Sequence, residues 1–204
     1  MASISAVLFD MDGVLVRSEE TWARVLEEAG VRFRGRPVTR EEFLPTFGQG
    51  TAADVRVFGL GCTNEELDAF YLESFPRHAA DSLWVNPDAA PLLTALARSG
   101  VRRAVVTNTL TALAARILEA AHLSSHFDVV ACADQVPHAK PAPDLVLHGC
   151  RRLGIAPKEA WMVGDSRFDA GAARAAGVHF VGLGLPGDAR IERLGALGGL
   201  LGVS

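Results

Sequence analysis

The second half of the chain alternates between helical and strand-like segments, and this order restricts the fold more than any other feature. From Pro87 onward, amphipathic helical stretches each precede a short apolar run rich in strand-forming residues. These apolar runs occupy residues 103–106, 127–131, 161–163 and 179–182. Strands that are separated by single helices form parallel sheets with helices on both faces. We therefore predict an α/β fold with a doubly wound, Rossmann-like parallel sheet at its core.

The first half of the chain contains one more strand-like run and then a long helical region. Residues 4–9 are apolar and β-prone, whereas residues 16–80 lack a convincing strand pattern. In this region one helix is expected from Glu19 to a stop at Gly30, and a second is expected after a cap at Asn64. The apolar face of the second helix is predicted to contain Leu67, Phe70, Tyr71 and Ser74. The sequence thus predicts an α/β core of residues 1–15 and 81–204, and a small all-α domain of residues 16–80.

Two carboxylates, Asp10 and Asp12, directly follow the first strand-like run. Open α/β sheets bind their ligands at the carboxyl ends of their strands. Two acids that lie close together in a dry environment repel each other, and a hard cation such as Mg²⁺, which prefers oxygen ligands, would offset that repulsion. The pair therefore indicates a magnesium site, although D-x-D-G alone is equally compatible with a solvated turn.

Three later stretches of the sequence also carry polar residues directly after an apolar run or in a loop. In RRAVVTNT, residues 102–109, Thr107 and Asn108 come at the end of the apolar run, and Lys140 lies in the proline-rich loop HAKPAPD. Asp165 and Asp169 belong to WMVGDSRFDAG. Together with the first acidic pair, these stretches resemble in order and content the four motifs of the haloacid dehalogenase-like hydrolases. The resemblance extends over the whole chain and is closest to the phosphoglycolate phosphatase and β-phosphoglucomutase-like group, in which a helical cap follows the first motif.

The resemblance implies a role for each of these residues. Asp10 would be the nucleophile that becomes an aspartyl-phosphate, and Asp12 would protonate the leaving oxygen and then deprotonate the attacking water. Thr107 and Asn108 would hold the phosphate through a hydroxyl and a backbone N–H. Lys140 would bind the phosphate as well and offset the negative charge. The implied metal site, for Mg²⁺, consists of Asp10, the backbone carbonyl of Asp12, Asp165 and Asp169.

Departures from related patterns narrow the expected activity. Dehalogenases of the superfamily lack the acid at the position of Asp12, and residues 16–80 contain no lysine for the Schiff base of the phosphonate hydrolases. The mutases carry a histidine where this chain has Trp22. We therefore expect a phosphatase for small phosphomonoesters, of the sugar-phosphate or phosphoglycolate type. A β-phosphoglucomutase-like phosphotransferase, and a phosphate-binding or signalling module without turnover, are the alternatives.

The resemblance also implies that the helical domain is a cap that reads the leaving group. Gln49 and Thr51, in the glycine-containing stretch FGQGT, are the candidate specificity residues, with an ordinary turn as the alternative. Arg17 or Arg56 would suit a substrate carboxylate. The arginine-rich residues 31–40 indicate either a basic site for an anionic substrate or a charged surface loop.

Composition limits the partners of the chain. A net charge of −4 argues against a nucleic-acid binder, and no apolar run is long enough to span a bilayer. The start lacks the basic segment of a secretion signal, and the three cysteines are widely spaced without a C-x-x-C pair. We therefore expect a cytoplasmic enzyme that acts on a small phosphorylated metabolite without nucleic-acid or membrane partners. A monomer is expected, with a dimer left open.

Overall fold

The computed structural model describes residues 4–79 and 83–203, and the chain divides into two compact units. The first unit contains Met1–Val16 and Val85–Ser204, and the second contains Arg17–Trp84. The second unit thus begins one residue later and ends four residues later than the all-α domain proposed from the sequence. Among the described residues, no helix combines the length and the apolar composition that crossing a membrane requires.

The first unit is built on a parallel sheet of six strands in the order β5-β4-β1-β6-β7-β8. The strands are β1 (Ala6–Phe9), β4 (Arg102–Thr107), β5 (Val129–Cys132), β6 (Ala160–Gly164), β7 (His179–Leu183) and β8 (Ala189–Ile191). From β1 the chain builds outward through β4 and β5, and it then returns to β6 on the other side of β1. This reversal makes the carboxyl ends of β1 and β6 the topological switch point of the sheet.

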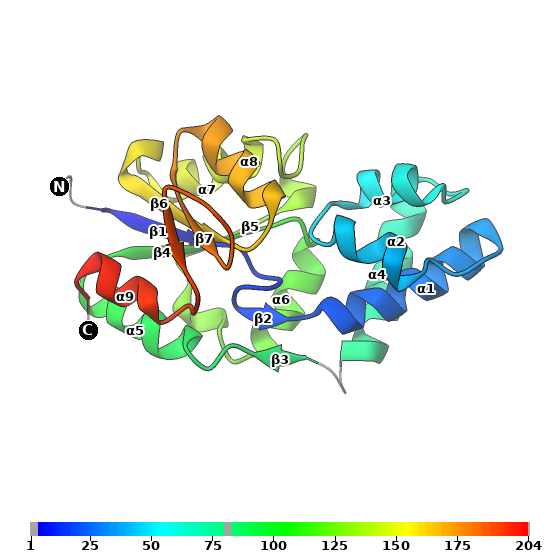
Figure 1. The fold of residues 1–204 in the computed structure, drawn as a ribbon, viewed down its shortest axis with the longest axis horizontal. Coiled ribbons are helices and arrows are strands. Elements are labelled where there is room, and N and C mark those ends of the chain that lie inside the picture. The colour runs from blue at the N-terminus through cyan, green and yellow to red at the C-terminus, as the bar shows by residue number, and fades with distance from the viewer. Residues whose placement is uncertain (1–3, 80–82, 204) are drawn as a thin grey trace. The chain divides into compact units, whose positions relative to one another are not determined.

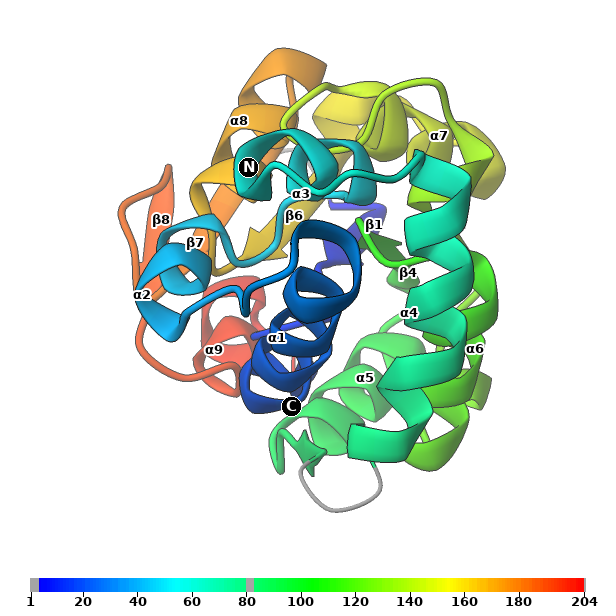
Figure 2. The ribbon, with the colours of Figure 1, turned by 90° about the vertical axis from the view of Figure 1, so that its right-hand side faces the viewer.

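Helices cover both faces of this sheet, which confirms the predicted doubly wound α/β fold (Figure 1). Helices α7 and α8 lie on one face, and α5, α6 and α9 lie on the other (Figure 2). Their bounds are α5 (Ala89–Arg98), α6 (Thr111–Ala120), α7 (Asp144–Leu153), α8 (Arg167–Ala176) and α9 (Ala196–Leu201). Single turns of 3₁₀ helix occur at η2 (Ser124–His126), η3 (Ala133–Gln135) and η4 (Pro157–Glu159). Strand β1 is buried along its whole length, as a central strand covered on both faces must be.

The second unit is helical. Its elements are α1 (Glu19–Arg34), α2 (Arg40–Phe43), η1 (Leu44–Thr46), α3 (Thr51–Phe58) and α4 (Asn64–Ala79). The chain passes between the units at β2 (Val16–Arg17) and β3 (Trp84–Val85), and these short strands pair with each other. Two residues are too few to produce a periodic pattern, so the sequence did not indicate either strand.

Helix α1 continues past Gly30, so the predicted stop at that residue is wrong. The helix ends instead before Gly35, which adopts the left-handed conformation with a φ of 74°. A Cβ at Gly30 would overlap the backbone of residues 36–38, because the chain packs closely against the helix there. Gly30 therefore serves close packing, and Gly35 serves the helix terminus.

Helix α4 buries the face that the sequence predicted, with Leu67, Phe70, Tyr71 and Ser74 all in the interior. Its cap differs from the prediction. The backbone N–H of Glu66 donates to the hydroxyl of Thr63, and the backbone N–H of Thr63 donates to the Glu66 carboxylate. This reciprocal pair is a capping box that begins one residue before Asn64.

Candidate active site

Three adjacent strands deliver polar residues to one edge of the sheet. Asp10 directly follows β1, Asn108 directly follows β4, and Asp165 directly follows β6. The backbone N–H of Asp10 donates to the carbonyl of Val163 at 2.9 Å, so the ends of β1 and β6 remain in register. The side chain of Asp10 is almost fully buried, at 7% exposure. These strand ends form the switch point of the sheet.

Gly13 allows the chain to turn sharply beside this edge. Its φ is +90°, a conformation that side-chain-bearing residues rarely adopt. A Cβ at this position would also overlap the carboxylate of Asp165. Glycine is therefore required twice, by the backbone conformation and by the close approach of the β1 loop to Asp165.

Lys140 is buried at the centre of the cluster. Its Nζ lies 2.7 Å from Oδ1 of Asp10 and 2.6 Å from Oδ1 of Asp169, and it donates to the carbonyl of Val106 at 3.0 Å. The side chain is only 2% exposed. Three acceptors therefore match the three donors of the ammonium group. Lys140 is therefore a buried, fully paired ammonium and not a solvated surface charge.

Asp169 is positioned by the start of helix α8. The backbone N–H and the hydroxyl of Ser166 both donate to Oδ2 of Asp169, and the N–H of Asp169 donates back to that hydroxyl. Oδ1 is taken by Lys140. Gly164 permits this arrangement, because a Cβ there would overlap the Asp169 side chain. The capping box of α8 is thus also the device that fixes the carboxylate.

The cluster carries more negative than positive charge. Burial, followed by the charge of Asp169, raises the pKa of Asp10 well above its usual value although Lys140 acts in the opposite direction. Burial and Asp169 likewise raise the pKa of Asp165 to about 7. Burial alone would lower the pKa of Lys140, but the charges of Asp10 and Asp169 outweigh it and raise the pKa above its usual value. The lysine therefore remains an ammonium. Its single positive charge does not balance the negative charges of the surrounding carboxylates.

The donor set fits a hard divalent cation. Asp10, Asp165 and Asp169 each offer a carboxylate oxygen, and these oxygens lie within 4.8 Å of one another. Carboxylate oxygens and uncompensated negative charge are what Mg²⁺ requires. Because both oxygens of Asp169 already accept hydrogen bonds, a supporting role suits this residue better than direct ligation. The carboxylate of Asp12 is outside this group, and ligation through its backbone carbonyl stays a prediction.

Asn108 has a role that the sequence did not indicate. Its Nδ2 donates to the carbonyl of Lys140 at 3.0 Å, and the backbone N–H of Lys140 donates to its Oδ1 at 2.8 Å. The amide therefore holds the loop that carries the lysine. Thr107 is buried, and its hydroxyl accepts from the backbone N–H of Thr109 at 3.0 Å. Phosphate binding by Thr107 and by the backbone N–H of Asn108 stays a prediction.

The two candidate specificity residues lie in the second unit and hydrogen-bond to different acids there. Nε2 of Gln49 donates to Oδ1 of Asp54 at 2.8 Å, and the hydroxyl of Thr51 donates to Oδ1 of Asp68 at 2.6 Å. The hydroxyl of Tyr71 donates to the second oxygen of Asp54 at 2.8 Å. Gln49 and Thr51 thus stabilise their own unit, and substrate recognition by them stays a prediction.

Asp54 should make the stability of the protein depend on pH. Burial raises its pKa from 3.8 to about 7, and the hydrogen bonds from Gln49 and Tyr71 only partly oppose this. A raised pKa favours the protonated folded form, so stability is fully present below pH 4 and is lost as the pH rises through about 7. Asp54→Asn removes the titration while keeping the size of the side chain. We expect the Tm of this variant to rise relative to the wild type between pH 5 and pH 8.

The control for this measurement is Glu27→Gln, which removes an exposed carboxylate from helix α1 of the same unit. Its Tm should follow that of the wild type at every pH. A difference between Asp54→Asn and the wild type that stays constant from pH 5 to pH 8 would show that Asp54 is ionised throughout.

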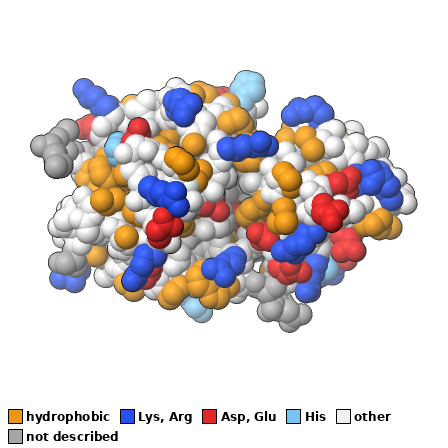
Figure 3. All heavy atoms as spheres, in the orientation of Figure 1, with side chains coloured by type: hydrophobic (Ala, Val, Ile, Leu, Met, Phe, Trp, Pro, Cys, Tyr) orange, Lys and Arg blue, Asp and Glu red, His pale blue; other side chains and the backbone are white. Residues whose placement is uncertain are grey.

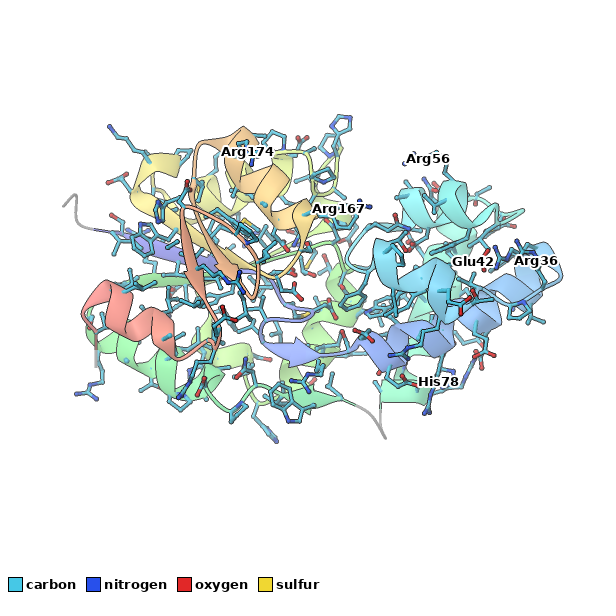
Figure 4. The ribbon with its side chains drawn as sticks, in the orientation of Figure 1. Arg36, Glu42, Arg56, His78, Arg167 and Arg174 are labelled. Atoms are coloured by element: carbon cyan, nitrogen blue, oxygen red, sulfur yellow. The ribbon has the colours of Figure 1, made fainter. Side chains whose placement is uncertain are left out.

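Three of the four arginines in residues 31–40 pair with acids of their own unit. Arg34 pairs with both oxygens of Glu42, at 3.2 and 2.6 Å, and Arg36 contacts the same carboxylate (Figure 4). Arg40 pairs with Glu19 and Glu20 on helix α1. Basic and acidic side chains are likewise interspersed on the face that Figure 3 shows. Of the two readings of residues 31–40, the charged surface is the one found.

The chain matches known proteins over nearly its whole length. The family model for haloacid dehalogenase-like hydrolases matches residues 4–177. The phosphoglycolate phosphatase of Chromobacterium violaceum is 32% identical over 201 residues, covering 95% of this chain and 90% of that protein. The phosphoglycolate phosphatase of Escherichia coli strain K12 is 33% identical over 206 residues, covering 88% of this chain and 81% of that protein.

The fold agrees with these matches. Crystal structures of CbbY from Rhodobacter sphaeroides, one with phosphate and one of a mutant with xylulose-(1,5)-bisphosphate, each have a TM-score of 0.84 to this structure. They are 25% identical to the chain, and the alignment covers 96% of both proteins. The fold, the polar cluster at its switch point and the sequence matches agree: the chain belongs to the haloacid dehalogenase-like hydrolases and is an enzyme of the phosphatase group of that family.

Proposed function

We propose that this enzyme hydrolyses small phosphomonoesters in two steps through an aspartyl-phosphate on Asp10. One observation carries the proposal: a buried ammonium, Lys140, lies between Asp10 and Asp169 at 2.7 and 2.6 Å, with Asp165 beside them. An arrangement of this kind stabilises the charge of a transferring phosphoryl group, because it is preorganised and excludes water.

In the first step, a carboxylate oxygen of Asp10 attacks phosphorus as the bond from phosphorus to the ester oxygen breaks. Asp12 gives its proton to that leaving oxygen, so the product is a neutral alcohol. In the second step, a water oxygen attacks phosphorus and the bond to Asp10 breaks, which releases inorganic phosphate. Asp12, now a carboxylate, takes the proton of the water and returns to its initial state. Lys140 offsets negative charge in both steps.

Mg²⁺ would be held by Asp10 and Asp165, with the backbone carbonyl of Asp12 as a further ligand and Asp169 in support. When bound, it supplies positive charge that neutralises the phosphoryl oxygens. The excess negative charge of the cluster supports this assignment, because the lysine alone does not balance three carboxylates.

Phosphoglycolate and sugar phosphates are the substrates that we propose to test first. Two relatives at 32% and 33% identity are named phosphoglycolate phosphatases, and a structural neighbour contains a sugar bisphosphate. The test is phosphate release by the purified enzyme from a panel of phosphomonoesters with Mg²⁺ present. Failure to release phosphate from any ester, p-nitrophenyl phosphate included, would contradict a hydrolase. A stable acyl-phosphate without turnover would instead favour a signalling module, and a phosphorylated isomer as product would favour a mutase.

We further propose that the enzyme is a cytoplasmic monomer. Cys62, Cys132 and Cys150 are all free in the described part of the chain, which suits a reducing compartment. Light scattering of the purified protein tests the oligomeric state, and fractionation of its host cell tests the compartment.

Asp165→Asn should lower the affinity of the proposed site for Mg²⁺ without changing the size of the side chain. Because a charged oxygen ligand becomes a neutral one, we expect the Mg²⁺ concentration for half-maximal activity to rise by at least ~10–100-fold. Titration of activity with Mg²⁺ measures this shift, and Glu119→Gln, an exposed site on α6, is the control.

Excess EDTA should stop the wild-type reaction. Calcium should inhibit it, since its longer bonds and higher coordination number allow it to engage both oxygens of Asp10. Full activity in EDTA would remove the metal from the proposal.

A further inference from the structure

A threonine that has no role in the proposed reaction so far contacts Asp12, the proposed acid and base. Thr109 lies in the short loop between β4 and α6 and is only 6% exposed. Its hydroxyl donates a hydrogen bond to Oδ2 of Asp12 at 2.8 Å. The two residues are 97 positions apart in the chain, and Asp12 is itself 8% exposed. A buried hydroxyl is thus paired with a buried carboxylate.

The loop that carries Thr109 is anchored at both ends. On one side, the backbone N–H of Thr109 donates to the hydroxyl of Thr107, the last residue of β4. On the other, the hydroxyl and backbone N–H of Thr111 donate to Asp134 at 2.8 and 3.0 Å. Nε2 of Gln135 donates in turn to the Thr111 hydroxyl at 3.0 Å. These bonds fix the backbone on which the Thr109 hydroxyl is mounted, so the hydroxyl is held toward Asp12.

We propose that Thr109 is a positioning residue that orients Asp12 for both proton transfers. This inference rests on the proposed phosphatase function, in which Asp12 alternates between acid and carboxylate. A carbonyl oxygen of a carboxylic acid accepts hydrogen bonds better than its hydroxyl oxygen does. A donor on Oδ2 therefore favours placing the acidic proton on Oδ1. In the first step that proton passes to the leaving oxygen, and in the second step Oδ1 receives the proton of the attacking water.

The same contact also joins the loop after β1 to the loop after β4, so a merely structural role must be distinguished from a positioning role. The two roles differ in their dependence on the leaving group. p-Nitrophenolate leaves without protonation, whereas an alkoxide needs a proton from Asp12. Loss of a positioning residue should therefore slow phosphoryl transfer from alkyl esters and spare transfer from p-nitrophenyl phosphate. General loosening of the site would slow both.

The experiment compares Thr109→Val, which has the shape of threonine without the hydroxyl, with Thr109→Ser, which keeps the hydroxyl. Values of kcat and kcat/KM are measured for p-nitrophenyl phosphate and for the alkyl phosphate that the wild type hydrolyses best. Because kcat/KM includes steps only up to release of the alcohol, it reports the transfer to Asp10. The value of kcat includes hydrolysis of the intermediate as well.

For Thr109→Val we expect kcat/KM for the alkyl ester to fall ~10–100-fold, as for loss of a hydrogen bond to a charged group. For p-nitrophenyl phosphate, kcat/KM should stay within about threefold, while kcat and KM fall together because water has lost a well-placed base. Thr109→Ser should restore all values to within about threefold of the wild type.

Equal losses of kcat/KM on both esters, or a serine variant as impaired as the valine variant, would overturn the inference and leave the phosphatase itself intact. So would a valine variant with wild-type kinetics. If circular dichroism shows that Thr109→Val does not fold, Thr109→Ala takes its place against Thr109→Ser, and the same pattern is required. Absence of turnover in the wild type would instead refute the proposed function, and the inference with it.

Discussion

Asp10→Asn is expected to reduce phosphate release below detection while leaving the protein folded. Asparagine has nearly the same size as aspartate, but its neutral amide is a poor nucleophile and cannot form the acyl-phosphate. Removing a covalent nucleophile typically costs several orders of magnitude in rate, because the group acts as a unit with its acid and base. The measurement is phosphate release with Mg²⁺ present, together with a search for phosphorylated protein by intact mass.

The same variant should be at least as stable as the wild type without metal. Burial and neighbouring acids raise the pKa of Asp10, which shows that its charge is disfavoured where it lies. Asparagine removes one of the crowded charges, and Lys140 keeps its ion pair with Asp169 at 2.6 Å. Loss of turnover with an unchanged or higher Tm would therefore mark a residue retained for chemistry at a cost in stability.

The control for the nucleophile is Glu119→Gln, which removes an exposed carboxylate of the same unit. Its activity and Tm should match those of the wild type. Wild-type turnover in Asp10→Asn would show that Asp10 is not the nucleophile. If another residue were found phosphorylated, that residue would be the nucleophile instead.

Lys140→Met is the change with the second largest expected effect, and it should impair both turnover and stability. Methionine fills a similar volume but carries no charge, so Asp10 and Asp169 would face each other without a cation between them. Breaking a buried ion pair by removing one partner costs about 3–5 kcal/mol. Turnover should fall by roughly 10³-fold or more, because the phosphoryl group loses a preorganised positive charge.

The loss of stability in Lys140→Met should depend on pH with a defined sign. Without the ammonium, Asp10 favours protonation even more strongly than it does in the wild type, where its pKa is already raised. A raised carboxyl pKa means that stability is present at low pH and is lost as the pH rises. The variant should therefore be closest to the wild type at pH 5 and furthest from it at pH 8. Addition of Mg²⁺ at pH 8 should recover part of the lost Tm.

The chain offers a matched control, because Lys158 is its other lysine and is exposed on η4. Lys158→Met should change neither the rate nor the Tm. A second check is the double variant Asp10→Asn with Lys140→Met. In this double variant Asp169 is the one carboxylate left of the two that Lys140 contacts. The double variant should therefore be more stable than Lys140→Met alone. If Asp10→Asn changed the stability of Lys140→Met by the same amount as it changes that of the wild type, the two groups would not be coupled, contrary to their 2.7 Å contact.

Local patterns in the sequence determined the architecture of the core. Apolar runs alternating with amphipathic helices specify a parallel sheet, and the carboxyl ends of parallel strands meet at one edge. Asp10, Asn108 and Asp165 each follow a strand directly, so the sequence was sufficient to place them at the carboxyl ends of strands. The family was identified from the order and content of the motifs, which are also local features of the sequence.

The tertiary structure decided which side chains meet and what each one holds. Asn108 holds the backbone of Lys140 across 32 positions, and Thr109 reaches Asp12 across 97. Gly30 lies inside a helix, where close packing against a neighbouring segment requires the absence of a side chain. Periodicity is a property of neighbouring residues and is written in the local sequence. Pairing between loops depends on where the completed sheet carries their ends, and no local pattern records that.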